Sequence, residues 1–492
     1  MRDIESDVVI IGCGIAGSVA AITAHDSGAK ALILEKMPNA GGNCPITMGN
    51  ILTPTKMEFV DYLEALSFKT TEREILETFV KVAIGNADWV RKMGGEVILY
   101  HPLSATYPLV ETGPGFPQVK HSEYMVKYNV KGARGEGSGG ERLWNLVRTN
   151  LEQRSIEIMT NTDVKEVVKS QKGEVVGVLA ESQGKGISVN ARKAVILASG
   201  GYANDAATKW DFYHAKPLLF LGSPANTGDG IRLGQKVGAA LWHMTNMIST
   251  IGFKAPEYEA AFGICFHDRD FIYVDKYGKR YIDEIGVEVH EFGREMGFFD
   301  TQRIEYPRIP TWVIFGEQCR RKGPLNTGAV GYNRKLYKWS KDNAAEISKG
   351  WIVQAQSVSE LANKISVDEI NLENTIKKYN GSCKTGKDPD FGRAEKYLVA
   401  IEAPYYAIQI SPALYCTQGG PRRDKDARVL DPDAKPIPRL YEAGELGSIT
   451  GGLYQGGNSL SECIVFGRIA GRNAAAEKDL TQAGHPERGN RR

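Results

Sequence analysis

The chain has 492 residues, of which 42% are hydrophobic and 24% are charged, and its formal net charge at neutral pH is +2. This composition is typical of a globular protein with room for two or three domains. Because the net charge is small, there is no general attraction to nucleic acid or to an anionic membrane, and we expect neither as a partner.

Three further absences limit the class of protein. No apolar run reaches the roughly 20 residues that a membrane-spanning helix needs. The N-terminus enters a strand almost at once and has no signal-peptide pattern. The seven cysteines are scattered without a CxxC pair, which argues against zinc and iron–sulfur sites and suits reduced thiols. We therefore expect a cytoplasmic protein without a membrane span or a metal site.

The first elements predict a strand–helix–strand unit. Residues 7–12 are a short apolar run that ends in glycine, the stretch to about Ser27 has helical spacing, and residues 31–34 are a second apolar run. This order over about 30 residues is typical of the βαβ unit.

The elements that follow alternate in character. Polar turns join three short strands into an expected antiparallel meander, and a buried strand then runs into glycines; these lie at 164–168, 175–180, 187–189 and 193–201. The region from about 251 to 370 is rich in aromatic residues, with a hairpin turning at Tyr277 and Gly278 and helices at 358–365 and 370–379. Strands at 405–410 and 437–443 and a helix at 467–475 close the chain.

These elements predict an α/β fold in which a Rossmann-type domain, carrying the antiparallel meander, is split in sequence by an inserted α+β capping domain. We assign the first part of the Rossmann-type domain to 1–250, the capping domain to 251–370, and the second part to 371–480. A polar tail at 481–492 follows.

The loop after the first strand fits a dinucleotide-binding pattern, GxGxxG, at Gly12, Gly14 and Gly17. The first glycine makes the turn, the second lets the backbone approach a pyrophosphate, and the third lets the helix pack closely. The helix N-terminus then faces the phosphates with free N–H groups. Glu35, 18 residues after Gly17, ends the second strand and can accept a hydrogen bond from a ribose hydroxyl.

Further motifs favour FAD over a nicotinamide cofactor. They occur in one order: GGN at 41–43, SGGYAND at 199–205, NTGDG at 226–230, VDKYGKRYIDE at 274–284, CTQGG at 416–420, YEAGE at 441–445 and GGNSL at 456–460. In this order they resemble the succinate dehydrogenase/fumarate reductase flavoprotein family, which also contains the ketosteroid dehydrogenases. The resemblance covers nearly the whole chain and implies FAD with a capping domain that closes over its isoalloxazine ring.

The resemblance also implies which residues bind FAD. Glu445 matches the acidic residue at the ribityl chain, and Ser459 and Leu460 match residues beside the ring. The full set of expected contacts is Gly12, Gly14, Ala16, Gly17, Glu35, Lys36, Gly42, Asn43, Met48, Gly49, Val164, Ser199, Gly200, Asn204, Asp229, Glu445, Asn458, Ser459 and Leu460. Members with covalent FAD carry a histidine near the position of Asn43, so we expect FAD to be bound without a covalent bond.

The cationic residues that grip a dicarboxylate in fumarate-type members are missing. Glu288 stands where these relatives have the arginine proton donor, Cys416 replaces a histidine, and Tyr454 replaces a second arginine. A Thr-Glu…Arg trio falls on Gly263, Ile264 and His267. A negative charge at Glu288 would repel a dicarboxylate. If the register slips past Tyr281, Arg294 or His290 takes that position instead.

The ketosteroid dehydrogenase branch offers another comparison. There a tyrosine hydroxyl and a nearby backbone N–H polarise the substrate's carbonyl, and GGLYQGGN at 451–458 places Tyr454 and Gly457 where that branch has its tyrosine and glycine. A phenol with an ordinary pKa of about 10 can donate a hydrogen bond to a developing enolate. Tyr454 and Gly457 are therefore our expected substrate-binding residues, and Tyr454, Tyr415, Cys416 and Glu288 our catalytic candidates. The alternative is that Tyr454 and Tyr415 only pack.

Two further regions each allow two interpretations. Five aromatic residues of the insert are either core or substrate pocket: Phe262, Phe266, Phe271, Tyr273 and Tyr281. The long stretch at 100–135 is either a loop on the substrate side or an oligomer contact. The isolated histidines His101, His121 and His290 favour structural roles.

The sequence thus predicts an FAD-dependent enzyme that dehydrogenates, or in reverse reduces, a carbon–carbon bond conjugated to a carbonyl. The expected substrate is an apolar, cyclic small molecule such as a ketosteroid or another enone. Two alternatives stay open: reduction of an unsaturated acid as in fumarate reductase, and an electron-transfer subunit of a complex. We expect a separate electron donor or acceptor, because no second GxGxxG for a nicotinamide occurs.

Overall fold

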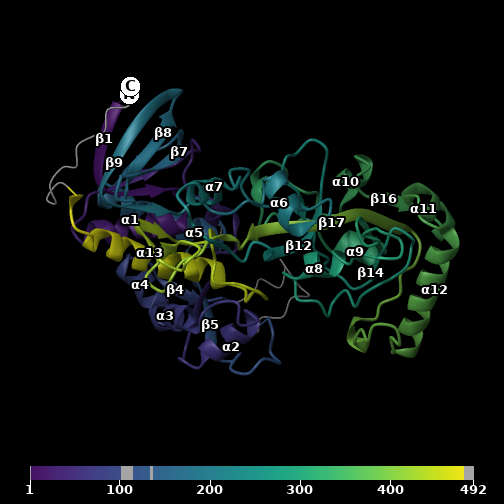
Figure 1. The fold of residues 1–492 in the computed structure, drawn as a ribbon. Helices are drawn as coiled ribbons and strands as arrows, with labels where there is room; N and C mark the ends of the chain where they lie inside the picture. The colour runs from purple at the N-terminus through teal and green to yellow at the C-terminus, as the bar shows by residue number, and fades with distance from the viewer. Residues whose placement is uncertain (1, 101–114, 133–136, 481–492) are drawn as a thin grey trace.

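The computed structural model describes residues 2–100, 115–132 and 137–480 (Figure 1). The tail at 481–492, His101 and about half of the stretch at 100–135 lie outside the described residues. Among the described helices, none is long and apolar enough to cross a bilayer.

The first sheet contains the predicted βαβ unit and has eight strands. Its parallel centre runs in the order β20 (Pro436–Glu442), β9 (Lys185–Leu197), β1 (Arg2–Ile11), β2 (Ala31–Leu34) and β6 (Glu157–Met159), with β19 (Arg428–Leu430) antiparallel at one edge. Alternate residues of β1 belong to different cores, Val8 and Ile10 to one and Val9 and Ile11 to the other. Burial on both faces explains the continuous apolar run in the sequence.

Helices cover one face of this sheet. They are α1 (Ile15–Asp26), α5 (Gly139–Gln153) and α13 (Asn458–Ala476), and Figure 1 shows α1 and α13 side by side. A Cβ on Gly471 of α13 would lie 2.3 Å from the carbonyl oxygen of Ala20, so this glycine permits the close approach. The closing helix begins at Asn458 rather than at Gly467, where the sequence pattern begins, and its N-terminus therefore reaches the functional site.

The predicted meander covers the other face. It comprises β7 (Thr162–Lys169), β8 (Val175–Ser182) and β9, paired antiparallel. The third meander strand and the buried strand that follows it form one continuous strand of 13 residues.

A smaller layer that the sequence did not predict lies below the helices in Figure 1. It has a three-stranded sheet in the order β3 (Ile51–Pro54), β5 (Met125–Val130) and β4 (Val97–Leu99). The accompanying helices are α2 (Phe59–Leu66), α3 (Arg73–Ala83) and α4 (Asn86–Lys92). Strand β5 contains Lys127, whose side chain lines the cavity described in the next section.

The second sheet has seven strands and forms the cap. Its main path is β13 (Phe262–Gly263), β12 (Met247–Phe253), β17 (Tyr405–Thr417), β15 (Thr311–Phe315) and β14 (Phe271–Val274), and β10 (Leu219–Phe220) and β16 (Val353–Ala355) also pair with β17. Helices α11 (Val358–Ile365) and α12 (Glu369–Thr385) pack at its far end (Figure 1). The expected hairpin turn occurs, with Gly278 at φ +76°, but a single bridge between Val274 and Arg280 follows it.

Strand β17 joins the cap to the first sheet. Its first half pairs with β15 and β16, and its second half pairs with β12 and ends beside the functional site. The second sheet therefore extends to Thr417, well past residue 370, where the sequence pattern predicts the end of the insert. The remaining short elements are α6 (Ala206–Tyr213), α7 (Asp229–Lys236), α8 (Phe292–Met296), α9 (Glu317–Lys322), α10 (Ala344–Ser348), β11 (Leu241–Trp242) and β18 (Gly420–Pro421).

Candidate active site

A cavity of about 1180 Å³ lies between the first sheet and the cap. The glycine loop and the ends of β1 and β2 line one part of it, and residues from β12, β14 and β17 of the cap line another. It is therefore large enough for a dinucleotide with a second molecule beside it.

The three glycines of the GxGxxG loop differ in their surroundings. Gly12 has φ +100°, and a Cβ there would lie 2.5 Å from the carbonyl oxygen of Ala198. A Cβ on Gly17 would lie 2.0 Å from the carbonyl oxygen of Gly12, so α1 could not pack against the loop. Gly14 faces the cavity, and a Cβ there would meet no atom within 4 Å. The backbone is thus closely packed at Gly12 and Gly17, and there is free space in the cavity next to Gly14.

Glu35 and Lys36 follow β2 at the same end of the cavity. The Glu35 carboxylate accepts hydrogen bonds from the backbone N–H groups of Cys13, at 2.8 Å, and Met37, at 2.9 Å. Lys36 Nζ lies 2.5 Å from Asp229, whose carboxylate it keeps ionised: burial raises the pKa of Asp229, but the ammonium group brings it below its usual value. Glu35 thus ties the end of β2 to the glycine loop, and Lys36 ties it to the start of α7.

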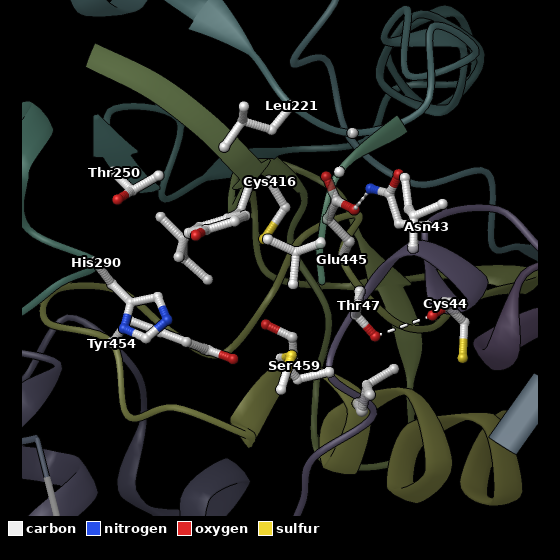
Figure 2. Close-up of a pocket in the computed structure, with 18 of the residues that line it drawn as sticks. Asn43, Cys44, Thr47, Leu221, Thr250, His290, Cys416, Glu445, Tyr454 and Ser459 are labelled. Atoms are coloured by element: carbon white, nitrogen blue, oxygen red, sulfur yellow. Dashed lines mark hydrogen bonds between the residues drawn. The ribbon is translucent and has the colours of Figure 1, made fainter. Parts of the chain in front are cut away.

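Glu445 lies at the middle of the cavity (Figure 2). Its carboxylate accepts hydrogen bonds at 3.3 Å from the side-chain amides of Asn43 and Asn226 and from the backbone N–H of Thr417. Burial raises the pKa of Glu445 to about 7. Asn43 also accepts a hydrogen bond from the backbone N–H of Ser223 at 2.8 Å, so its orientation is fixed.

Most residues expected at the cofactor line this cavity. They are Gly12, Gly14, Ala16, Glu35, Lys36, Gly42, Asn43, Met48, Gly49, Val164, Ser199, Gly200, Asp229, Glu445, Ser459 and Leu460. Three of the expected residues are not in the lining. Gly17 packs against the loop instead, Asn204 donates to the carbonyl of Pro224 at 2.9 Å, and Asn458 donates to Thr450 at 3.1 Å.

The other end of the cavity contains Tyr454. Its hydroxyl oxygen accepts a hydrogen bond from the backbone N–H of Gly457 at 3.2 Å, and its backbone N–H donates to Glu291 at 3.2 Å. Burial raises the pKa of Tyr454 to about 12, so the phenol keeps its proton at neutral pH. Figure 2 shows its hydroxyl pointing toward Ser459. The N–H of Gly457, which we expected to face a substrate, instead supports this hydroxyl.

Glu288 and His290 lie next to Tyr454. His290 Nδ1 is 2.8 Å from Glu288 Oε1, and the two rings of His290 and Tyr454 meet edge to face with centroids 4.9 Å apart. Burial raises the pKa of Glu288, but His290 and Lys127 together bring it below its usual value. The carboxyl group is therefore ionised. Burial also lowers the pKa of Lys127, which lines the same part of the cavity.

Tyr415 and Cys416 close this end of the cavity at the end of β17. The rings of Tyr415 and His290 lie 5.9 Å apart. Burial raises the pKa of the Cys416 thiol well above its usual value, so it is a neutral thiol rather than a thiolate. The structure thus brings the four catalytic candidates and Gly457 around one space.

The cavity and its lining suit FAD on structural grounds. Gly14 leaves room at a helix N-terminus, and the buried hydroxyl of Ser199 has no hydrogen-bond partner within the described part of the chain. A family model described as an FAD-binding domain matches residues 7–460. The chain belongs to this FAD-binding family. FAD is accordingly its cofactor.

Comparison with individual proteins agrees with the expected resemblance. Fumarate reductase (cytochrome) of Shewanella frigidimarina is 29% identical over 95% of this chain and 77% of its own length. Vinyl phenol reductase of Lactiplantibacillus plantarum is 27% identical over 95% of each chain. The structure of a 3-ketosteroid Δ1-dehydrogenase from Sterolibacterium denitrificans superposes with a TM-score of 0.82, at 21% identity, over 96% of this chain and 99% of that one.

Some relatives are much longer than this chain. NADH:acrylate oxidoreductase of Vibrio harveyi is 28% identical over 95% of this chain, and the chain spans half of that protein's length. The similarity therefore extends over one portion of these longer proteins. The resemblance to the fumarate reductase flavoproteins, and the fold shared with ketosteroid dehydrogenases, are confirmed.

No arginine lines the cavity among the described residues. Arg294, the alternative considered for the proton donor, is turned away: it pairs with Glu291 at 2.7 Å and donates to the carbonyl of Gly452 at 2.9 Å. His267 is also turned away, with Nε2 3.1 Å from the carbonyl of Pro324. Among the described residues, Ile264 and His290 line the cavity, as do Glu288, Cys416 and Tyr454, whereas Gly263, His267 and Arg294 do not.

Two residues of the site were not among the expected site residues. Lys127 was given no role, because this lysine lies in a strand that the sequence did not predict. His290 was expected to be structural unless the register slips past Tyr281, which would give it the position of the proton donor. The presence of Lys127 shows that the pocket is not free of cations, as the loss of the clamping residues suggested. Three of the five cap aromatics, Phe266, Phe271 and Tyr273, line the cavity and also belong to the cap core.

Proposed function

We propose that this chain is an FAD-dependent oxidoreductase that reduces, or in reverse dehydrogenates, a carbon–carbon bond conjugated to a carbonyl in a neutral, apolar and cyclic substrate. The observation that carries the proposal is the lining beside Tyr454, which has no arginine among the described residues. When bound, FAD supplies the hydride chemistry. The chain's residues bind, orient and exchange protons with the substrate.

The charges in this part of the cavity favour a neutral guest. Burial lowers the pKa of Lys127, and Glu288 raises it. Burial raises the pKa of Glu288, and Lys127 lowers it, as expected for a cation and an anion at short range. The carboxylate of Glu288 offsets the charge of Lys127, so a dicarboxylate gains little from this lysine. Binding one would leave Glu288 facing a like charge in a buried site, which is costly.

The apolar lining favours a flat and extended guest. Phe266, Phe271 and Tyr273 are at most 5% exposed, and Ile251 and Phe292 line the same space. Contact with these side chains removes apolar surface of a guest molecule from water, which stabilises binding by roughly 25 cal/mol for each Å² buried. A small diacid has too little apolar surface to use this lining.

Tyr454 is the proposed group that polarises the substrate carbonyl. Its proton is retained at neutral pH, since burial raises its pKa to about 12. A neutral phenol held in a dry site can donate to the oxygen on which negative charge develops. The N–H of Gly457 fixes the phenol oxygen next to Ser459, at the end of the cavity where the substrate is proposed to bind.

Two of the relatives support this class of substrate. The vinyl phenol reductase and the 3-ketosteroid dehydrogenase are both named for cyclic, uncharged compounds. A separate electron donor or acceptor, not NADH bound directly, completes the proposed cycle.

FAD is proposed to bind without a covalent bond. The side chain of Asn43 is held by Glu445 and by Ser223 and offers no nucleophile. The neighbouring Cys44 thiol donates to the carbonyl of Gly140 at 3.3 Å. Acid precipitation should therefore leave the yellow cofactor in the supernatant, and flavin retained in the pellet would contradict this part of the proposal.

The test of the main proposal uses reduced viologen as electron donor. Fumarate and a 4-ene-3-ketosteroid are added separately, and reoxidation of the dye is followed. Oxidation of the dye by the enone but not by fumarate is the expected result. Turnover of fumarate at ordinary enzyme rates would instead favour reduction of an unsaturated acid.

One observation favours that second candidate. Lys127 could bind a single carboxylate in the cavity, as the likeness to fumarate reductases and to the acrylate enzyme suggests. Lys127→Met separates the two candidates. It should abolish binding of an unsaturated acid, whereas a neutral enone should lose much less affinity.

A further inference from the structure

We propose that His290 exchanges the proton with the substrate carbon next to the carbonyl, and that Glu288 positions its imidazole for this step. The inference rests on the proposed function, since it assigns the proton in that reaction. It goes beyond the polarising role of Tyr454 and gives a chemical role to a histidine for which the sequence patterns favour a structural one.

Glu288 holds His290 at two points. Its Oε1 atom is 2.8 Å from the imidazole Nδ1, and its Oε2 atom accepts the backbone N–H of His290 at 2.7 Å. One carboxylate thus fixes both the backbone and the ring of the same residue. An ionised carboxylate accepts hydrogen bonds, so it keeps a proton on Nδ1 and leaves Nε2 as the exchanging nitrogen.

The second nitrogen of the ring is available to a substrate. His290 lines the cavity, and its side chain is 23% exposed. Within the described ranges, the hydrogen bonds of this side chain involve Nδ1 alone. Figure 2 shows the ring in front of Tyr454, in agreement with the edge-to-face distance of 4.9 Å. His290 and the hydroxyl of Tyr454 therefore belong to the same part of the cavity.

Lys127 and His290 both come close to Gly456. A Cβ at Gly456 would lie 3.6 Å from His290 Cε1 and 3.6 Å from Lys127 Nζ. Both side chains thus approach the same short piece of backbone, which begins two residues after Tyr454. His290 and Lys127 both lower the pKa of Glu288 against the rise caused by burial.

Tyr454 is less suited to move the proton. Burial raises its pKa to about 12, far from neutral pH, whereas efficient proton transfer requires a group matched to the working pH. An imidazole is the side chain most often used for such transfer. The two groups therefore divide the work, with the phenol on the carbonyl oxygen and the imidazole on the neighbouring carbon.

Atoms and electrons balance in the proposed step. In the reducing direction, bound reduced FAD would supply a hydride with its electron pair to one alkene carbon, and His290 gives its Nε2 proton to the other. The π bond breaks, two C–H bonds form, and the two electrons would come from the cofactor. The imidazole then takes a proton from water, and an external donor reduces FAD again. Dehydrogenation is the reverse.

The test compares His290→Ala with wild type in the holoenzyme, reduced with dithionite and mixed with a 4-ene-3-ketosteroid. Proton transfer by a positioned group contributes roughly 100-fold or more, so reoxidation should slow by about that factor. Added imidazole should restore part of the rate, which it would not do for a group that only packs. A loss below about threefold, or a loss that imidazole leaves unchanged, would overturn the proposal.

His121→Asn is the matched control. His121 is a second histidine near a carboxylate, with Nε2 3.6 Å from Asp61, but it does not line the cavity. Its substitution should leave the reoxidation rate unchanged. Glu288→Gln should slow reoxidation by less than His290→Ala, because the imidazole remains but is no longer held in one orientation.

A measurement without substrate separates this inference from the proposed function. In holoenzyme labelled with ¹⁵N-histidine, the resonance that disappears in His290→Asn identifies this ring. Its shifts should report a proton on Nδ1, and Glu288→Gln should shift the proton toward Nε2. A wild-type ring protonated on Nε2 alone would refute the role of Glu288, whichever substrate is used. If no enone reoxidises wild type but the tautomer is as expected, the same variants are tested with fumarate.

Discussion

The backbone N–H of Gly457 donates a hydrogen bond to the hydroxyl oxygen of Tyr454 over 3.2 Å. Gly457 has φ +93°, in the left-handed region that favours glycine, and it is the residue just before α13. The start of this helix thus positions the phenol. The hydroxyl's own proton stays available, because burial keeps the pKa of Tyr454 at about 12.

Tyr454→Phe should therefore impair reduction of an enone. Removing one donor from a developing oxyanion typically lowers kcat by roughly 100-fold, and the ring's packing is retained in this variant. Stopped-flow reoxidation of the reduced holoenzyme measures the effect. A decrease of less than about threefold, below ~0.7 kcal/mol of barrier, would show that the phenol is not the polarising group.

Two glycine substitutions should separate FAD binding from folding. Gly14→Ala places a methyl group in the open space of the cavity, so we expect a folded protein with FAD affinity lowered at least about tenfold. Gly17→Ala places its Cβ 2.0 Å from the carbonyl oxygen of Gly12, so we expect loss of folded protein. Flavin titration and thermal unfolding measure the two effects.

Gly381→Ala is the control for these glycines. It lies in α12, and a Cβ there meets no atom within 4 Å. Replacing a helical glycine with alanine should stabilise the protein by roughly 0.5–1 kcal/mol and leave FAD binding unchanged. Equal FAD affinity in Gly14→Ala and Gly381→Ala would exclude the pyrophosphate from the position next to Gly14.

The sequence predicted the parts of the fold that have strong local patterns. The GxGxxG loop, the meander and the helix at 358–365 follow from periodicity and turn residues over short spans. Strand β17 was harder, because its second half, from Ser411 to Thr417, is stabilised by pairing with β12 from a distant part of the chain. A pairing of this kind leaves little trace in a local pattern.

The same difference applies to the site. Tyr454, Tyr415 and Glu288 could be predicted as site residues because each lies in or beside one of the motifs that occur in a fixed order along the chain. Lys127 was missed because it reaches the cavity from β5, whose neighbours β3 and β4 lie far away in sequence. The proposed role of His290 depends on the 2.8 Å distance between its Nδ1 atom and Glu288 Oε1. The sequence places the two residues close together but does not show whether their side chains are in contact.

Glu445 should make the FAD-free protein less stable as pH rises. Burial raises its pKa from 4.5 to about 7, so the folded state holds a proton that the unfolded state releases. The stabilisation is therefore complete below pH 4.5 and is lost as pH rises through about 7, by about 3 kcal/mol in all. Urea unfolding of wild type and Glu445→Gln at pH 5 and pH 8 measures this. Equal pH dependence in both proteins would contradict the assignment.

Arg423 should be essential to stability because it neutralises two buried carboxylates. Its guanidinium lies 2.6 Å from Glu442 and also binds Glu462, and all three side chains are at most 1% exposed. Arg423→Met leaves both acids without their cation, and removing one partner from a buried pair costs roughly 3–5 kcal/mol. Chemical unfolding of the holoenzyme measures the loss.

The pH dependence of this variant gives the sharper result. Burial raises the pKa of both Glu442 and Glu462, and without the arginine the main charge opposing that rise is removed. Raised carboxyl pKa values mean that stability is present at low pH and is lost as pH increases, so Arg423→Met should be more stable at pH 5 than at pH 8. Adding Glu442→Gln and Glu462→Gln should remove the part of this slope that these two acids cause, because the amides cannot ionise. A slope in the triple variant as steep as that of Arg423→Met would place its origin in other groups.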